Sequence, residues 1–135
     1  METSHVAYIG NLVTEAVHLS SGTRIITDAP IDNHGKGSAF SPSDLLATSL
    51  ASCMLTVLGI AAETHGFSID GATAKVTKIM VSDPRRVGGI KVEMRFPGNN
   101  YSEKEKELVR RIALSCPVAK SLHPEIKQDI EFIFK

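Results

Sequence analysis

The chain has 135 residues, the size of one ordinary domain, and its 15 basic and 15 acidic side chains give a formal net charge of zero. A neutral chain lacks the concentrated basic surface of a nucleic-acid-binding protein, so we exclude that class. The start of the chain, Met1–His5, has neither the basic residues nor the apolar stretch of a signal peptide. We therefore expect a cytoplasmic protein, in which thiols are kept reduced and a functional disulfide is transient.

The N-terminal part is predicted to form short strands followed by a loop. Apolar and β-branched residues around a turn at Ser20–Gly22 predict strands at His5–Ile9, Leu12–Leu19 and Thr23–Thr27. The segment Asp28–Phe40 contains proline, asparagine and glycine residues that are typical of irregular loops.

A long helix is predicted to follow this loop. Ser41 and Asp44 have the spacing of a capping box, Pro42 occupies the first helical position, and Gly66 ends the helix. Apolar side chains lie around most of its circumference, which is typical of a helix buried on nearly all sides. In so small a protein, this burial indicates a sheet on one side and a second subunit on another.

The run Leu45–Ala62 carries no charged residue and approaches the minimum length of a membrane-spanning helix. Its hydrophobicity is diluted by hydroxyl side chains, and no lysine or arginine anchors either end. We therefore expect a helix buried inside a soluble protein, with no membrane contact.

The C-terminal half is predicted to alternate strands and helices. Strands are expected at Ala72–Val81 and Ile90–Phe96, joined by a hairpin loop at Asp83–Gly89. Ser102 and Glu105 form a second capping box, which opens an amphipathic helix.

Pro117 is predicted to interrupt this second helix, and a short turn continues to Leu122. Ile126–Phe134 has the pattern of a last strand, with Ile126, Ile130, Phe132 and Phe134 on one face. The prediction is a single α+β domain over residues 1–135, with two helical segments against an antiparallel sheet.

The chain has two cysteines, Cys53 and Cys116, so any thiol chemistry must use this pair. Cys116 precedes Pro117 and is predicted to lie at a helix N-terminus, where the dipole favours a thiolate. Cys53 lies mid-helix among apolar neighbours, which disfavour a thiolate unless a cation is supplied. Buried cysteines often act as small apolar residues, so a redox pair and a packing role both stay open.

Five arginines are candidates to supply that cation: Arg24, Arg85, Arg86, Arg110 and Arg111. A metal role for the cysteines with His65 and His123 is not expected, because the close ligand spacings of zinc sites are missing. We therefore predict no metal.

Two sequence blocks resemble a known family. Ser41–Cys53 reads S-P-S-D-L-L-A-T-S-L-A-S-C, and Cys116–Pro124 reads C-P-V-A-K-S-L-H-P. Together with the hairpin at Ser82–Val92, they are similar to the OsmC/Ohr family of thiol-dependent peroxidases, in the general OsmC-like branch. The resemblance covers nearly the whole chain in the right order.

This resemblance implies an intertwined homodimer whose two central helices are buried together, with an active site at each subunit boundary. It further implies that Cys53 attacks an organic hydroperoxide and that Cys116 resolves the oxidised residue as a disulfide. An external dithiol reductant would recycle the disulfide, with no metal, haem or flavin cofactor.

The chain departs from the family pattern at two positions. Well-characterised members carry a glutamate ten residues before the first cysteine, where this chain has Ser43, with Asp44 adjacent. They also carry an activating arginine in an early loop, and Arg24 is the only arginine before Cys53. Asp44 and Arg24 are therefore the candidates for orienting or activating the thiolate. The alternative is a non-catalytic dimer that binds a small molecule or lipid, with structural cysteines.

Overall fold

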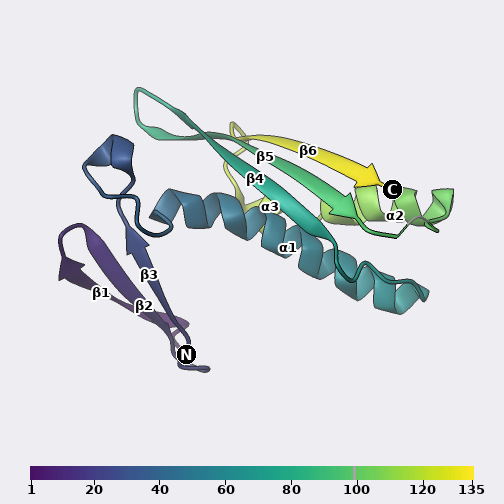
Figure 1. The fold of residues 1–135 in the computed structure, drawn as a ribbon, viewed down its shortest axis with the longest axis horizontal. Coiled ribbons are helices and arrows are strands. Elements are labelled where there is room, and N and C mark those ends of the chain that lie inside the picture. Colours follow the sequence, from purple (N-terminus) through teal and green to yellow (C-terminus); the bar gives the residue numbers. More distant parts are fainter. Residues whose placement is uncertain (99) are drawn as a thin grey trace. The chain divides into compact units, whose positions relative to one another are not determined.

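The computed structural model describes residues 1–98 and 100–135. The chain divides into two compact units, Met1–Leu46 and Ala47–Lys135, and passes from one to the other within helix α1 (Pro42–His65). The two units are described separately below (Figure 1).

The first unit is built on a three-stranded antiparallel sheet. Its strands follow chain order: β1 (Ser4–Gly10), β2 (Val13–His18) and β3 (Arg24–Asp28). The three predicted strands are thus confirmed, with ends shifted by a few residues. Apolar side chains on this sheet remain exposed in the single chain, including Tyr8, Ile25 and Ile26.

The loop after β3 is closed by one buried carboxylate. Asp28 is 1% exposed, and its Oδ2 accepts hydrogen bonds from both the backbone N–H and the hydroxyl of Ser38. These hydrogen bonds hold the pKa of Asp28 below its ordinary value. The loop therefore has defined ends, although it contains only a short 3₁₀ helix, η1 (Ile31–Asn33).

The second unit contains a mixed sheet of three strands: β4 (Thr73–Val81), β5 (Arg86–Phe96) and β6 (Lys127–Phe134). β4 pairs with β5 antiparallel, but β6 pairs with β5 in parallel. The prediction of a purely antiparallel sheet is therefore wrong. A parallel pair needs a long crossover connection, and here helices α2 (Glu103–Ala113) and α3 (Pro117–Ser121) supply it.

Strand β5 begins earlier than predicted. Arg86–Gly89, expected in the hairpin loop, pair with the end of β4 instead. A Cβ atom at Gly88 would collide with the side chain of Val81, so glycine permits this close approach. Gly88 and Gly89 therefore mark a place where β5 lies close to the side chains of β4, and the turn that connects the two strands is shorter than expected.

Helix α1 has the predicted boundaries. The Asp44 carboxylate accepts a hydrogen bond from Ser41 N–H at 2.9 Å, and Ser41 Oγ accepts one from Asp44 N–H at 3.0 Å, which forms the capping box. Gly66 follows the helix with φ of +76°, a left-handed conformation that favours glycine.

The burial of α1 is one-sided in the single chain. Leu50, Met54 and Leu58 are fully buried, whereas Leu46 and Ile60 are exposed. In the second unit, α1 runs along the sheet of β4, β5 and β6 (Figure 1). Among the described residues, α1 is the one helix long and apolar enough to cross a membrane. A core helix passes the same test, so this is weak evidence for a membrane span.

The core of the second unit joins α1, β5 and α2. Its largest fully buried side chain is Phe96 at the end of β5. Phe96 stacks on Phe134 of β6, with ring centroids 4.9 Å apart, and meets Tyr101 edge-on at 6.1 Å. Lys106 and Arg110 of α2 lie over the Phe134 ring at 5.7 and 5.4 Å. This aromatic cluster fixes α2 against the sheet.

We expect Phe96→Ala to lower the free energy of unfolding by about 3–5 kcal/mol, because it leaves a cavity at the centre of this cluster. Urea denaturation followed by circular dichroism measures the change. Lys91→Ala is the control, since Lys91 is exposed on the same strand and its loss should change stability by less than about 0.5 kcal/mol. A loss below about 1 kcal/mol for Phe96→Ala would show that the cluster contributes little.

Candidate active site

Cys53 lies near the middle of α1, in the part of the helix that belongs to the second unit. Its side chain is half-buried and packs against the apolar core. The helix therefore presents one thiol at the edge of the core, close enough to solvent for a reagent to approach.

Cys116 is the N-cap residue of α3, and Pro117 follows at the first helical position, as predicted. The backbone N–H of Ala119 donates a hydrogen bond to the Cys116 Sγ at 3.3 Å. The side chain is fully buried, however, and this burial raises the pKa of the Cys116 thiol above its ordinary value. The prediction that the helix N-terminus makes Cys116 acidic is therefore wrong, because burial outweighs the hydrogen bond.

Cys53 packs against the same core that buries Cys116, and its proximity further raises the pKa of the Cys116 thiol. Both cysteines are reduced in this structure. The fold thus brings together two residues that are 63 positions apart in sequence (116 − 53 = 63). The raised pKa means that the Cys116 thiol tends to keep its proton.

A side chain of the sheet is hydrogen-bonded to helix α3, whose N-cap residue is Cys116. The Nε2 of Gln128 on β6 donates a hydrogen bond to the carbonyl oxygen of Ala119 at 3.0 Å. Both backbone groups of Ala119 are thus hydrogen-bonded, because its N–H donates to the Cys116 sulfur. This connection places Cys116 relative to the sheet.

Arg24 lies on β3, in the first unit. Its Nη1 forms an ion pair with Oε1 of Glu15 on β2 at 2.7 Å, and its side chain is largely exposed. A role for Arg24 beside a thiolate stays a prediction. In the second unit, Arg86 donates to the carbonyl groups of Ser82 and Pro84.

Asp44 forms the N-terminal capping box of α1 through its two hydrogen bonds with Ser41. This contact gives its carboxylate a structural role within the first turn of the helix. Its assignment as a residue that orients the thiolate also stays a prediction.

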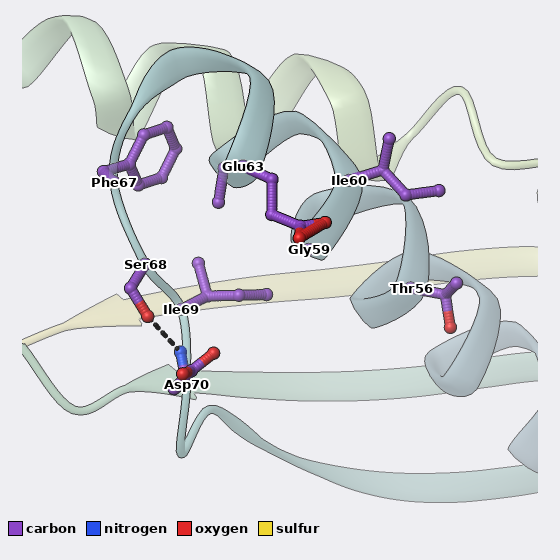
Figure 2. A pocket seen from close by; sticks show the side chains of 9 residues that line it. Thr56, Gly59, Ile60, Glu63, Phe67, Ser68, Ile69 and Asp70 are labelled. Carbon is purple, nitrogen blue, oxygen red and sulfur yellow. Dashed lines mark hydrogen bonds between the residues drawn. The ribbon is translucent and has the colours of Figure 1, made fainter.

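A pocket of about 520 Å³ opens beside the C-terminal half of α1. Figure 2 shows its lining side chains, with Ser68 Oγ accepting a hydrogen bond from the backbone N–H of Asp70 at 3.0 Å. The helical part of the lining starts at Thr56, three residues after Cys53, but neither cysteine lines the pocket. Over residues 1–98 and 100–135, no three His, Cys, Asp or Glu side chains gather in a group that could hold a metal ion.

The family model for OsmC-like proteins matches residues 35–131, a segment that contains both cysteines. The chain belongs to the OsmC-like family. No curated protein sequence matches it.

Solved structures of OsmC-like proteins share the fold of this chain. A proposed osmotic-stress-induced and detoxification response protein from Psychrobacter arcticus 273-4 is 53% identical, with a TM-score of 0.94 over 98% of this chain and 96% of that one. The organic hydroperoxide resistance protein OsmC from Legionella pneumophila is 15% identical, with a TM-score of 0.77 over 98% of each chain.

OhrB of Bacillus subtilis, an organic hydroperoxide resistance protein, is also 15% identical. Its TM-score is 0.71, over 97% of this chain and 98% of that chain. At this identity, the likeness to the Legionella and Bacillus proteins concerns the fold alone.

One polar residue bonded beside Cys116 was missed in the sequence. Gln128 lies in the row of β6 side chains that faces the core, where its neighbours in the row are apolar. The sequence pattern placed Ile126, Ile130 and Phe132 on that face and passed over the polar position between them. A polar residue in an apolar row is the signal that could have found it, because a buried amide needs a hydrogen-bond partner.

Proposed function

We propose that this OsmC-like protein is a thiol-dependent peroxidase that reduces organic hydroperoxides, with Cys53 as the attacking residue and Cys116 as the resolving residue. The observation that carries this proposal is the proximity of Cys53 and Cys116, of which one is half-buried against the apolar core and the other is fully buried in it. The raised pKa of Cys116 supports the assignment of roles, because a protonated thiol is a poor first nucleophile.

The reaction balances with two thiols and one peroxide. The Cys53 thiolate attacks the terminal peroxide oxygen, the O–O bond breaks, and the alkoxide takes a proton and leaves as an alcohol. Cys53 is then a sulfenic acid. The Cys116 sulfur attacks the Cys53 sulfur, a disulfide forms, and water leaves. An external dithiol returns both residues to thiols.

The surroundings of Cys53 favour an organic substrate. Val57 and Ile60 follow it at one and two helical turns along α1, where Val57 is half-buried and Ile60 is exposed, and the Cys53 side chain packs on the apolar core. The free energy of an alkyl group falls when the group leaves water for such an apolar surface, whereas hydrogen peroxide has no apolar part to bury. We therefore propose alkyl or lipid-like hydroperoxides as the substrate class.

We also propose that the active protein is a cytoplasmic homodimer. Large apolar side chains are exposed in each unit, Tyr8, Ile25 and Ile26 in the first and Ile60 in the second, and this exposure supports a second copy as the partner.

The test counts free thiols per chain before and after one equivalent of cumene hydroperoxide, with hydrogen peroxide in a parallel sample. We expect rapid loss of both thiols and faster loss with the organic peroxide. Mass spectrometry of non-reduced peptides should locate a Cys53–Cys116 disulfide. Survival of both thiols would contradict the proposal.

A second candidate function is a non-catalytic dimer that binds a small molecule or lipid. It is favoured by the engagement of Arg24 with Glu15 and of Asp44 with Ser41, since both candidate activating residues already have structural partners. Here, the cysteines would be packing residues, and neither should react with N-ethylmaleimide before unfolding. The peroxidase proposal expects Cys53 to react in the folded protein.

A further inference from the structure

We infer that Gln128 is a positioning residue for disulfide formation: by holding helix α3 to the sheet, it keeps the Cys116 thiol aimed at Cys53. The inference rests on the proposed use of the two cysteines as a redox pair. It assigns a role to a residue outside both sequence blocks that carry the cysteines.

The geometry links Gln128 to the Cys116 sulfur through one residue. The Gln128 side-chain amide donates to the Ala119 carbonyl at 3.0 Å, and the Ala119 N–H donates to Cys116 Sγ at 3.3 Å. Ala119 is itself buried in the core. Gln128 therefore acts on the thiol through the backbone of α3 and does not contact the reacting atoms.

Helix α3 needs such an anchor because it is short. It has five residues, and at its two ends Lys120 N–H donates to Cys116 O and Leu122 N–H donates to Val118 O. A helix of this length is not stable by itself and relies on tertiary contacts. The Gln128 amide is a directional contact from a rigid strand, so it fixes the orientation of the helix as well as its distance from the sheet.

The position of Gln128 on β6 supports a dedicated role. Ile130, Phe132 and Phe134 occupy the same face and pack on the core. An apolar residue at position 128 would satisfy that face equally well but would leave the Ala119 carbonyl without this donor.

The consequence concerns the second step of the reaction. Once Cys53 is a sulfenic acid, attack by Cys116 competes with further oxidation by a second peroxide molecule. A thiol held in line with its target reacts faster than one that must first find the orientation. Loss of the anchor should therefore slow disulfide formation and leave the initial attack by Cys53 unchanged.

The test uses 4,4′-dithiodipyridine at one equivalent, so that it does not depend on peroxidase activity. The Cys53 thiolate first breaks the reagent's S–S bond, forms a mixed disulfide and releases one thiopyridone. The Cys116 thiolate then attacks the Cys53 sulfur, forms the internal disulfide and releases the second thiopyridone. Absorbance records the two releases as separate phases.

We expect Gln128→Ala and the equally sized Gln128→Glu to slow the second phase about 3- to 10-fold, the effect of losing one hydrogen bond, with the first phase unchanged. The matched control is Ile130→Val, which removes a methylene group from the same face of the same strand and costs comparable stability without removing the hydrogen bond to Ala119.

Equal second phases in wild type and both Gln128 variants would overturn the inference. An equal slowing in Ile130→Val would also overturn it, because the effect would then follow from general stability. A parallel sample with cumene hydroperoxide separates the two proposals. If wild type shows both dithiodipyridine phases but does not react with the peroxide, the proposed function fails while the positioning role is still decided by the variants.

Discussion

Replacing Cys53 by serine is expected to lower the turnover of cumene hydroperoxide at least about 10³-fold, the scale of losing an essential nucleophile. The physical reason is that a serine hydroxyl at neutral pH is a far weaker nucleophile toward a peroxide oxygen than a thiolate. Cys116 cannot take over the first attack, because its sulfur is fully buried and its pKa is raised. The measurement is steady-state peroxide consumption with a dithiol reductant in excess.

The control for this variant keeps the number of thiols constant. Ser52 is the exposed neighbour of Cys53 on α1, and one helical step rotates a side chain by about 100°. The double variant Ser52→Cys with Cys53→Ser therefore carries two cysteines, one of them pointing away from Cys116. It should stay as inactive as Cys53→Ser. Recovery of activity in the double variant would mean that any thiol on this part of the helix suffices.

The elements of the fold were predictable where local chemistry determines them. The capping boxes at Ser41 and Ser102, the break at Pro117 and the left-handed Gly66 are set by residues close in sequence, and all lie where the pattern predicted them. The parallel pairing of β6 with β5 was not predictable in this way. It depends on how α2 and α3 cross the sheet, which no strand pattern records.

The candidate site follows the same division. Both cysteines were identified from the sequence, and the position of Cys116 at a helix N-terminus was correct. The direction of its pKa was not, because the burial of Cys116 is a property of the folded core and not of the local sequence. The hydrogen bond from Gln128 to Ala119 was missed for a related reason: its two residues lie on different elements that meet only after folding.

Replacing Cys116 by serine is expected to leave the first oxidation of Cys53 intact and to prevent its resolution. The variant should consume about one peroxide per chain rapidly, and the Cys53 sulfenic acid should then continue to sulfinic acid, since no neighbouring thiol traps it. Intact-protein mass spectrometry should show two added oxygen atoms on the variant and none on the wild type, which instead loses two hydrogen atoms on forming its disulfide.

The pH dependence of disulfide formation in the wild type gives a second test of the role of Cys116. Because the folded protein raises the pKa of Cys116, its thiolate fraction is small at pH 7 and increases with pH through and beyond the ordinary thiol range of about 8.5. The rate of disulfide formation after a single peroxide pulse should therefore rise across that range. In Cys116→Ser, the oxidation of the sulfenic acid should lack this rise.

Full turnover of Cys116→Ser with a dithiol reductant would contradict the resolving role, because the reductant would then reach the Cys53 sulfenic acid directly.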